Sequence, residues 1–360
     1  MINRYFSFIL LIGFTCTTLI SFAGNPDRQG EAGAYELLMN PWARSAGLSA
    51  MTASNVTGVE AMRINIAGLS RINKTEINIG HTDYLSATNT KLNAFGLAQK
   101  VGKTGTLGLS LMSIDFGELR VTTTDQPDGT GATFEPTFFN IGLGYSYMFE
   151  NKIAVGILFR VVSESNAEIT GMGLGIDAGV QYVTGENDNF KFGIALRNIG
   201  TKMRFSGQGL SVRLDPDDIG PNDGIVLKQD AATFELPSLL NIGISNDFYL
   251  GKARESDVVS AHRLTLLAAF TANSFSRDQI GGGLEYSFKE RFMLRAGYKI
   301  EVGQEDNVDI NNVYSGLSAG ASFALPISKK NRDNQLIISY AYRATDVFDG
   351  THNFGVSIAL

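Results

Sequence analysis

The chain has 360 residues, and its composition narrows the class of protein before any motif is considered. Glycine occurs 40 times, phenylalanine 23 times and tyrosine 12 times, while only 18% of the residues are charged. Hydrophobic residues make up 44%, yet the mean hydropathy is +0.01. This low mean argues against a helical membrane protein, because each span needs roughly 20 apolar residues in a row. Barrel strands need only about 10 residues with alternate ones apolar, so the composition permits a membrane β-barrel.

Residues 1–23 have the layout of a secretory signal peptide. Arg4 supplies positive charge, Phe6–Ile20 is an apolar core, and Ser21-Phe22-Ala23 has small residues at the positions that matter for cleavage. A membrane-anchor helix is the alternative, but the apolar run is short and polar residues follow at once. Cleavage after Ala23 would remove Cys16, the single cysteine. We therefore expect no disulfide, no zinc–thiolate site and no thiol catalysis.

The expected mature chain is acidic. Arg4 is the one charged residue of the signal, so 29 of the 30 basic residues remain beside 36 acidic ones, a balance of 29 − 36 = −7. Acidic and basic residues are interspersed, which argues against nucleic acid as a partner.

Residues 24–73 differ from the rest of the chain. They contain the only tryptophan, Trp42, and a run of small residues over Ala43–Ser54. Small residues at this density allow a helix or turn to pack closely against another backbone. We expect this segment to pack against a wall and not to form a lipid-facing strand.

From Lys74 onward, apolar residues alternate with small or polar ones. The pattern is clear in residues 139–149, 172–182 and 292–301. Successive side chains of a strand point to opposite faces, so each segment has one apolar face and one small or polar face.

About fourteen such segments follow one another: 74–84, 91–100, 105–116, 136–149, 152–163, 170–183, 189–199, 237–249, 261–272, 279–288, 291–301, 313–325, 334–344 and 351–360. Nearly all can cross a hydrocarbon core at a strand tilt of about 45°. Soluble sandwiches use shorter strands, of about five or six residues. The sequence therefore predicts an all-β fold, a transmembrane antiparallel β-barrel of about 14 strands over residues 74–360.

The gaps between these segments fit such a barrel. Gaps at 101–104, 150–151, 185–188 and 289–290 are short, and those near 251–260 and 326–333 are moderate. The longest gaps, 117–135 and 200–236, both fall at the opposite end, as expected when periplasmic turns alternate with longer outer loops. The last segment, His352–Leu360, alternates up to the final residue. We expect it to pair with the first strand, because an open edge in lipid leaves backbone groups unsatisfied.

Eight charged residues lie on the small-residue faces and are expected to point into the lumen: Arg160, Asp177, Lys191, Arg197, Glu285, Arg295, Lys299 and Arg343. For any one of them the favoured interpretation is the ordinary polarity of a barrel interior. The functional alternative is a charged path or a network that holds an internal plug.

We expect no catalytic residue, no metal site and no cofactor. His81, His262 and His352 fall in separate strands and lack the spacing of a metal-ligand pair. A base and nucleophile pair of His352 and Ser357 has little support. The loop Asp215–Gly224 is acidic but lacks the spacing of a calcium loop, so a solvated loop is expected.

Several short motifs resemble those of a known family. Three of them, Gly33-Ala-Tyr-Glu-Leu-Leu38, Ala43-Arg-Ser-Ala-Gly-Leu48 and Asn65-Ile-Ala-Gly-Leu-Ser70, are similar to the N-terminal signature of the PorV/PorQ family. That family is related in architecture to the FadL-type fatty-acid transporters. Its members usually have proline where Ile66 stands. Internal landmarks of the family resemble Phe116-Gly-Glu118, Leu196-Arg-Asn-Ile-Gly200 and Leu236-Pro-Ser-Leu-Leu-Asn-Ile-Gly243.

The resemblance implies a barrel in the outer membrane of a Bacteroidetes-like Gram-negative bacterium, with residues 24–73 folded inside as a hatch. It also implies a role in the type IX secretion system, where such barrels bind the translocon barrel and cargo with a C-terminal signal domain. The residues predicted to belong to the hatch are Tyr35, Trp42, Arg44, Asn65 and Gly68. Carboxylates such as Asp177 and Glu285 are the expected wall partners of its anchoring residues.

Two function classes remain open. One is a barrel that binds the translocon or cargo through the outer loops 117–135 and 200–236. The other is a FadL-like channel for hydrophobic small molecules, with an apolar ligand in a pocket behind the hatch. The inward faces are mainly Gly, Ser, Asn and charged residues, with Met148, Leu158 and Met293 as exceptions. This favours protein binding.

Overall fold

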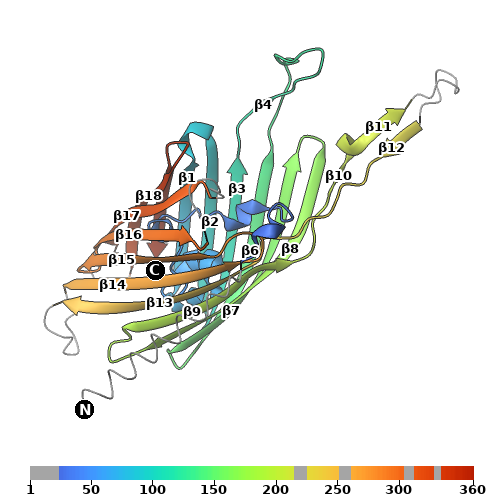
Figure 1. Cartoon of the computed structure of the whole chain (residues 1–360). Helices are drawn as coiled ribbons and strands as arrows, with labels where there is room; N and C mark the ends of the chain where they lie inside the picture. Colours follow the sequence, from blue (N-terminus) through green and yellow to red (C-terminus); the bar gives the residue numbers. More distant parts are fainter. Residues whose placement is uncertain (1–23, 215–224, 251–260, 304–311, 328–333) are drawn as a thin grey trace.

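Fourteen long antiparallel strands form one closed barrel (Figure 1). The computed structural model describes residues 24–214, 225–250, 261–303, 312–327 and 334–360. The predicted signal peptide, the acidic loop at 215–224, the turn at 251–260 and most of the turn at 326–333 lie outside these ranges. The barrel strands are β1 (Thr75–Tyr84), β2 (Thr90–Val101), β3 (Gly105–Asp115), β6 (Thr137–Phe149), β7 (Ile153–Asn166), β8 (Ile169–Thr184), β9 (Phe190–Gly200), β13 (Leu239–Leu250), β14 (His262–Asn273), β15 (Gln279–Phe288), β16 (Phe292–Glu301), β17 (Tyr314–Pro326), β18 (Gln335–Thr345) and β19 (Thr351–Ala359).

The last strand closes the barrel against the first, which confirms the expectation from the C-terminal alternation. Glu76 lies opposite Ala359, and the pairing continues to Asp83 opposite His352. Every other wall strand pairs with its neighbours in chain order. The predicted strand count and the closed antiparallel barrel are therefore both confirmed.

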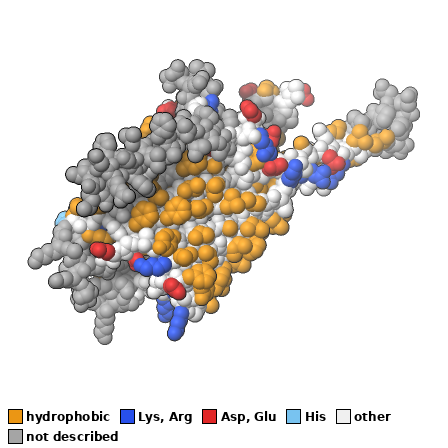
Figure 2. Space-filling view, turned by 60° about the horizontal axis from the view of Figure 1, so that its bottom comes forward, with side chains coloured by type: hydrophobic (Ala, Val, Ile, Leu, Met, Phe, Trp, Pro, Cys, Tyr) orange, Lys and Arg blue, Asp and Glu red, His pale blue; other side chains and the backbone are white. Residues whose placement is uncertain are grey.

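Alternation along the strands divides the two faces of the wall. On β8, Met172 and Leu174 are 63% and 57% exposed, whereas Asp177 and Gln181 on the other face are buried. Figure 2 shows the outward apolar side chains gathered over the side of the barrel. Such a belt is what a hydrocarbon core requires of the outer face.

Short turns join the strands at one end, which we call the short-turn end. At Glu150-Asn151 and Lys289-Glu290 both residues have positive φ, between 47° and 59°. This conformation matches the twist of the flanking strands in tight hairpins.

At the opposite, long-loop end, the two longest loops carry short strands that the sequence pattern did not indicate. They are β4 (Leu119–Arg120) paired with β5 (Thr133–Phe134), β10 (Phe205–Gly207) paired with β8, and β11 (Ser211–Leu214) paired with β12 (Ile225–Lys228). β11 and β12 form an arm that projects from the barrel (Figure 1).

The N-terminal segment contains only short helices. They are η1 (Pro26–Arg28), η2 (Tyr35–Leu38), α2 (Ala43–Ala46), η3 (Gly58–Glu60), α3 (Ala61–Ile64) and η4 (Ile66–Arg71). Two further turns of 3₁₀ helix, η5 (Ser86–Thr88) and η6 (Gln208–Leu210), lie in loops. Among the described residues, no helix combines the length and hydrophobicity needed to cross a bilayer.

Candidate functional site: the hatch inside the barrel

The N-terminal segment fills the lumen as a hatch. Most of its apolar side chains form one cluster with inward residues of β2, β3 and β7, in which Val59, Leu69, Leu92 and Leu158 are at most 1% exposed. The inward faces of β2 and β3 are more apolar here than the sequence suggested, because they pack against the hatch. Small or polar side chains prevail elsewhere on the inner wall.

Inward glycines let the hatch backbone approach the wall closely. A Cβ at Gly156 would lie 2.9 Å from the carbonyl oxygen of Ile66. A Cβ at Gly80 would lie 2.9 Å from the carbonyl oxygen of Pro41. Contacts this short leave no room for a side chain, so these wall positions accept only glycine while the hatch is in place.

The hatch is held largely through its own main-chain carbonyl groups. Donors on six wall strands bond to them: Arg160 to Met62 (3.0 Å), Arg197 to Leu37 (3.0 Å), Gln181 to Val56 (3.0 Å), Ser146 to Ala67 (2.8 Å), Asn353 to Asn40 (3.1 Å) and Ser318 to Gly47 (3.2 Å). Buried carbonyls without regular secondary structure need such partners. The polar inner wall therefore satisfies the irregular backbone of the hatch.

Asp177 organises the arginines of this wall. Its carboxylate accepts hydrogen bonds from the Arg160 guanidinium (3.0 Å) and from the main-chain N–H of Asn198 (2.7 Å). The β8–β9 register shifts at this point, and Asn198 has φ of 59°. A bulge lets two residues of one strand oppose one residue of the other. Arg197 and Asn198 are consequently both buried, and Asn198 bonds to the carbonyl of Pro237 (3.0 Å).

Asn65 joins the hatch to β8. Its amide nitrogen donates to the carbonyl oxygens of Ala53 (2.8 Å) and Val180 (3.0 Å), and its side-chain oxygen accepts from the N–H of Ala67 (3.2 Å). A Cβ at Gly179 would overlap that side-chain oxygen. The anchor therefore depends on a glycine on the wall.

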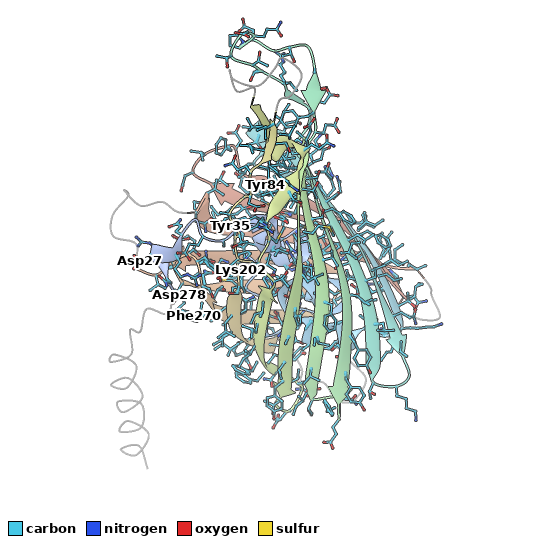
Figure 3. The ribbon with its side chains drawn as sticks, turned by 90° about the vertical axis from the view of Figure 1, so that its right-hand side faces the viewer. Asp27, Tyr35, Tyr84, Lys202, Phe270 and Asp278 are labelled. Atoms are coloured by element: carbon cyan, nitrogen blue, oxygen red, sulfur yellow. The ribbon has the colours of Figure 1, made fainter. Side chains whose placement is uncertain are left out.

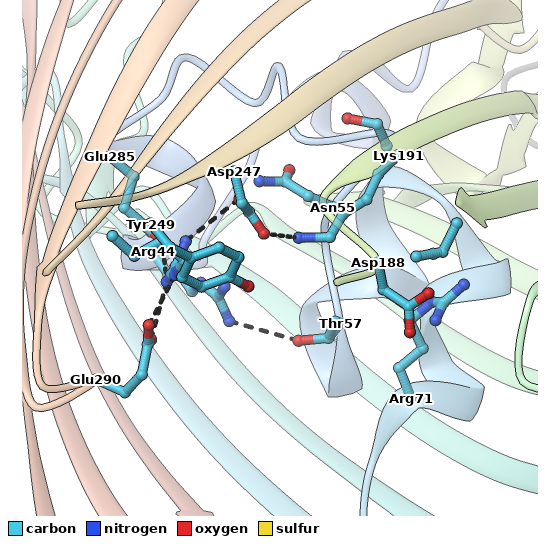
Figure 4. Close-up of a pocket in the computed structure, with 13 residues that line it drawn as sticks. Arg44, Asn55, Thr57, Arg71, Asp188, Lys191, Asp247, Tyr249, Glu285 and Glu290 are labelled. Carbon is cyan, nitrogen blue, oxygen red and sulfur yellow. Dashed lines mark hydrogen bonds and ion pairs between the residues drawn. The ribbon is translucent and has the colours of Figure 1, made fainter. Parts of the chain in front are cut away.

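A charged cavity of about 420 Å³ lies at the short-turn end, between the hatch and β9, β13 and β14 (Figure 4). Arg263 at its edge bonds to Glu285 (3.0 Å) and Glu290 (2.7 Å), and Glu285 also accepts from Arg295. Lys191 pairs with Asp247. The acidic residues that line this cavity are thus already compensated by wall cations.

The structure differs from the expected anchoring of the hatch. Arg44 lines the charged cavity and donates to the Thr57 hydroxyl (3.4 Å), and within the described residues it forms no ion pair. Asp177 and Glu285 are bonded to wall groups instead, because neighbouring strands place arginines beside them. Tyr35 is 43% exposed, in the half of the molecule nearer the long loops (Figure 3). Trp42, Asn65 and Gly68 are buried.

The other predicted lumen residues occupy the inward strand faces. Arg295 is buried, while Lys191, Lys299 and Arg343 are partly exposed. The Arg343 guanidinium lies 3.4 Å from the centre of the Tyr314 ring. Residues that the sequence analysis did not single out include Gln181, Arg263 and Asn353, all on inward positions of alternating strands. Their alternation was visible in the sequence, but nothing there marked Gln181 and Asn353 as donors to the hatch, or Arg263 as the partner of Glu285 and Glu290.

Comparison with known proteins identifies the fold. No model of a known protein family matches the chain, and no curated protein is similar to it in sequence. The structure is similar to CymD, a monoaromatic hydrocarbon channel, with a TM-score of 0.51 and 13% identity over 89% of this chain and 96% of that chain. It is also similar to the P. putida toluene transporter TodX, with a TM-score of 0.51 and 12% identity over 88% and 96%. At these identities the likeness shows a shared fold, a closed antiparallel β-barrel.

Proposed function

We propose that this chain is an outer-membrane barrel that admits small apolar molecules past its hatch. The observation that carries the proposal is an apolar seam between hatch and wall. Ala34 and Leu37 of the hatch pack there against Val162, Met203 and Leu236. These side chains lie between the interior of the barrel and its long-loop end.

The pairing of wall strands β8 and β9 ends beside this seam. Pairing of β8 with β9 ends at Gly175 opposite Gly200, although β8 extends further, to Ile169. Three residues of β10 cover part of the remaining edge. Ala32 forms a bridge with Glu235, so the hatch and the segment between β12 and β13 close the seam together. Displacement of this local contact requires far less rearrangement than expulsion of the whole hatch.

Two further points support an apolar cargo. The solved structures that share the fold include a monoaromatic hydrocarbon channel and a toluene transporter. An apolar molecule also loses little on entering a seam lined by aliphatic side chains, whereas a polar one would leave its hydrogen bonds to water unreplaced.

Uptake by whole cells tests the proposal. A Gram-negative host producing the protein should take up the apolar dye N-phenylnaphthylamine faster than a host without it, with no gain for a polar sugar. In the double variant Ala32→Cys, Glu235→Cys, the two new thiols should form a disulfide that abolishes the gain in dye uptake, and reduction should restore it. The variant Val226→Asp, on the projecting arm, is the matched control. Equal dye uptake with and without the barrel would contradict the proposal.

The projecting arm favours a second candidate, protein binding at the long-loop end. On this two-stranded ribbon Val212, Val226 and Leu227 are 52%, 65% and 50% exposed. A ribbon of two short strands is marginally stable alone, so a partner that covers it would stabilise it. The type IX secretion role and the PorV/PorQ relationship rest on the short motifs alone and remain predictions. Recovery of a translocon barrel or cargo from mild-detergent membranes, lost with Val226→Asp, would establish this candidate.

A further inference from the structure

One buried acid of the hatch has no role in the contacts described so far. Glu36, on η2, is 1% exposed. Neither of its carboxylate oxygens accepts a hydrogen bond from a donor in the described part of the chain. A buried carboxylate without a donor is costly, so it either binds a cation or carries a proton.

The polar group beside Glu36 is a second acid, Glu164 of β7, which is 5% exposed. Two carboxylates can hydrogen-bond to each other only if one of them is protonated. Burial, followed by the charge of Glu164, raises the pKa of Glu36 to about 8. At neutral pH the pair therefore holds a proton.

The other charged group that acts on Glu36 is Arg63 on α3, and Arg160 on β7, Asp177 on β8 and Arg197 on β9 lie around Arg63. The arginines are directed at backbone: Arg63 bonds to the carbonyls of Glu36 and Met39, and Arg197 bonds to that of Leu37. Three guanidinium groups disfavour a metal cation at this place. Calcium would also need about six to eight oxygen ligands. A proton is the cation that fits.

We propose that Glu36 and Glu164 form a proton-operated latch that holds the hatch segment Gly33–Met39 against β7. Loss of the shared proton leaves two buried carboxylates facing each other, and their repulsion releases this segment. Because Ala34 and Leu37 belong to the apolar seam, release opens the seam. The latch deepens the proposed function by naming its regulation. It rests on that function only for the kind of molecule that passes through the opened seam.

Thiol accessibility tests the latch without any transport assay. The mature chain is predicted to have no cysteine, so Ala34→Cys introduces a single reporter, 2% exposed in the native residue. Ala46→Cys is the control for the pH dependence of thiol chemistry. Ala46 is 0% exposed and lies in α2, which packs against β18. Between pH 7 and pH 9 the deprotonated fraction of a group with a pKa near 8 rises about tenfold. Maleimide labelling at position 34 should rise about tenfold relative to position 46.

The variants Glu36→Gln and Glu164→Gln should each abolish this rise, because one neutral amide removes the repulsion. Glu31→Gln, an exposed acid nearby, should leave it unchanged. A pH-dependent rise that survives in both buried variants would overturn the latch. A change in labelling on addition of calcium or EDTA at fixed pH would also overturn it. If labelling at position 34 depended on pH but the protein gave no dye uptake, the transport function would be contradicted and the latch would stand.

Discussion

The Arg197 guanidinium on β9 donates a hydrogen bond to the main-chain carbonyl oxygen of Leu37 in the hatch, at 3.0 Å. The same direction of bonding recurs around the lumen, from wall side chains to hatch carbonyls. A carbonyl group is present whatever the side chain of its residue. These hydrogen bonds therefore depend on the side chains of the wall donors and not on the side chains of the hatch residues they hold.

Substitution of Asp177 should destabilise the barrel strongly. Asp177→Ala leaves the buried Arg160 guanidinium without its carboxylate, and breaking a buried pair costs about 3–5 kcal/mol. Asp188→Ala removes the exposed pair with Lys152 and should cost about 0–1 kcal/mol. Denaturant unfolding in detergent, followed by the shift of the barrel band in gels, gives both values. Equal costs would show that Asp177 is not the organising group.

Two glycines on the inward face of β8 should respond differently to alanine. Gly179→Ala places a methyl group against the side-chain oxygen of Asn65, and overpacking of this kind costs about 1–3 kcal/mol. At Gly175 the nearest atom to a new Cβ is Leu236 Cδ1 at 3.5 Å, an ordinary contact, so Gly175→Ala should be tolerated.

The Gly179→Ala effect should be smaller in a chain that also carries Asn65→Ala, since the clashing atom is then absent. Planar-bilayer recordings offer a second readout. Gly179→Ala should show more frequent current steps than Gly175→Ala if Asn65 fastens the hatch. Additive free energies for the two substitutions would argue against their direct contact.

Trp42 and Arg44 are close in sequence, but their contributions to stability should differ. Trp42 is 3% exposed in the hatch cluster, so Trp42→Ala should cost about 3–5 kcal/mol. Arg44 forms no ion pair with the described residues, and Arg44→Ala should cost less than about 1 kcal/mol. Midpoints of thermal unfolding for the two single variants measure this. A larger loss for Arg44→Ala would restore the ionic anchor expected from the sequence.

Stability should fall with rising pH through the window set by Glu36. Its pKa in the folded protein is raised to about 8 from the ordinary 4.5, so the folded state binds the extra proton between these values. Where the folded state binds more protons, stability decreases as pH increases. Unfolding midpoints should decline from about pH 5 to pH 8 and then level off. Glu36→Gln should flatten this part of the profile, and an unchanged decline would place its origin in other groups.

The barrel could be predicted from the sequence because its signals are local. Alternation in residues 172–182 determines which side chains of β8 face outward, and strand length alone separates a membrane barrel from a sandwich. The final strand, up to Leu360, indicated closure, because an edge in lipid has no other partner. The inward polarity of Arg160, Asp177 and Arg197 was visible for the same reason.

What these residues bond to was decided only by the tertiary structure. Arg160 and Asp177 meet through strand register, and the bulge beside Asp177 turns both Arg197 and Asn198 inward. The hatch is held by its carbonyl groups, which are the same in every residue and leave no trace in a sequence pattern. Glu36 likewise looks like any acid in a helical turn, and only the lumen around it removes water and places Glu164 beside it. Period and composition are properties of the chain, whereas desolvation and pairing belong to the folded barrel.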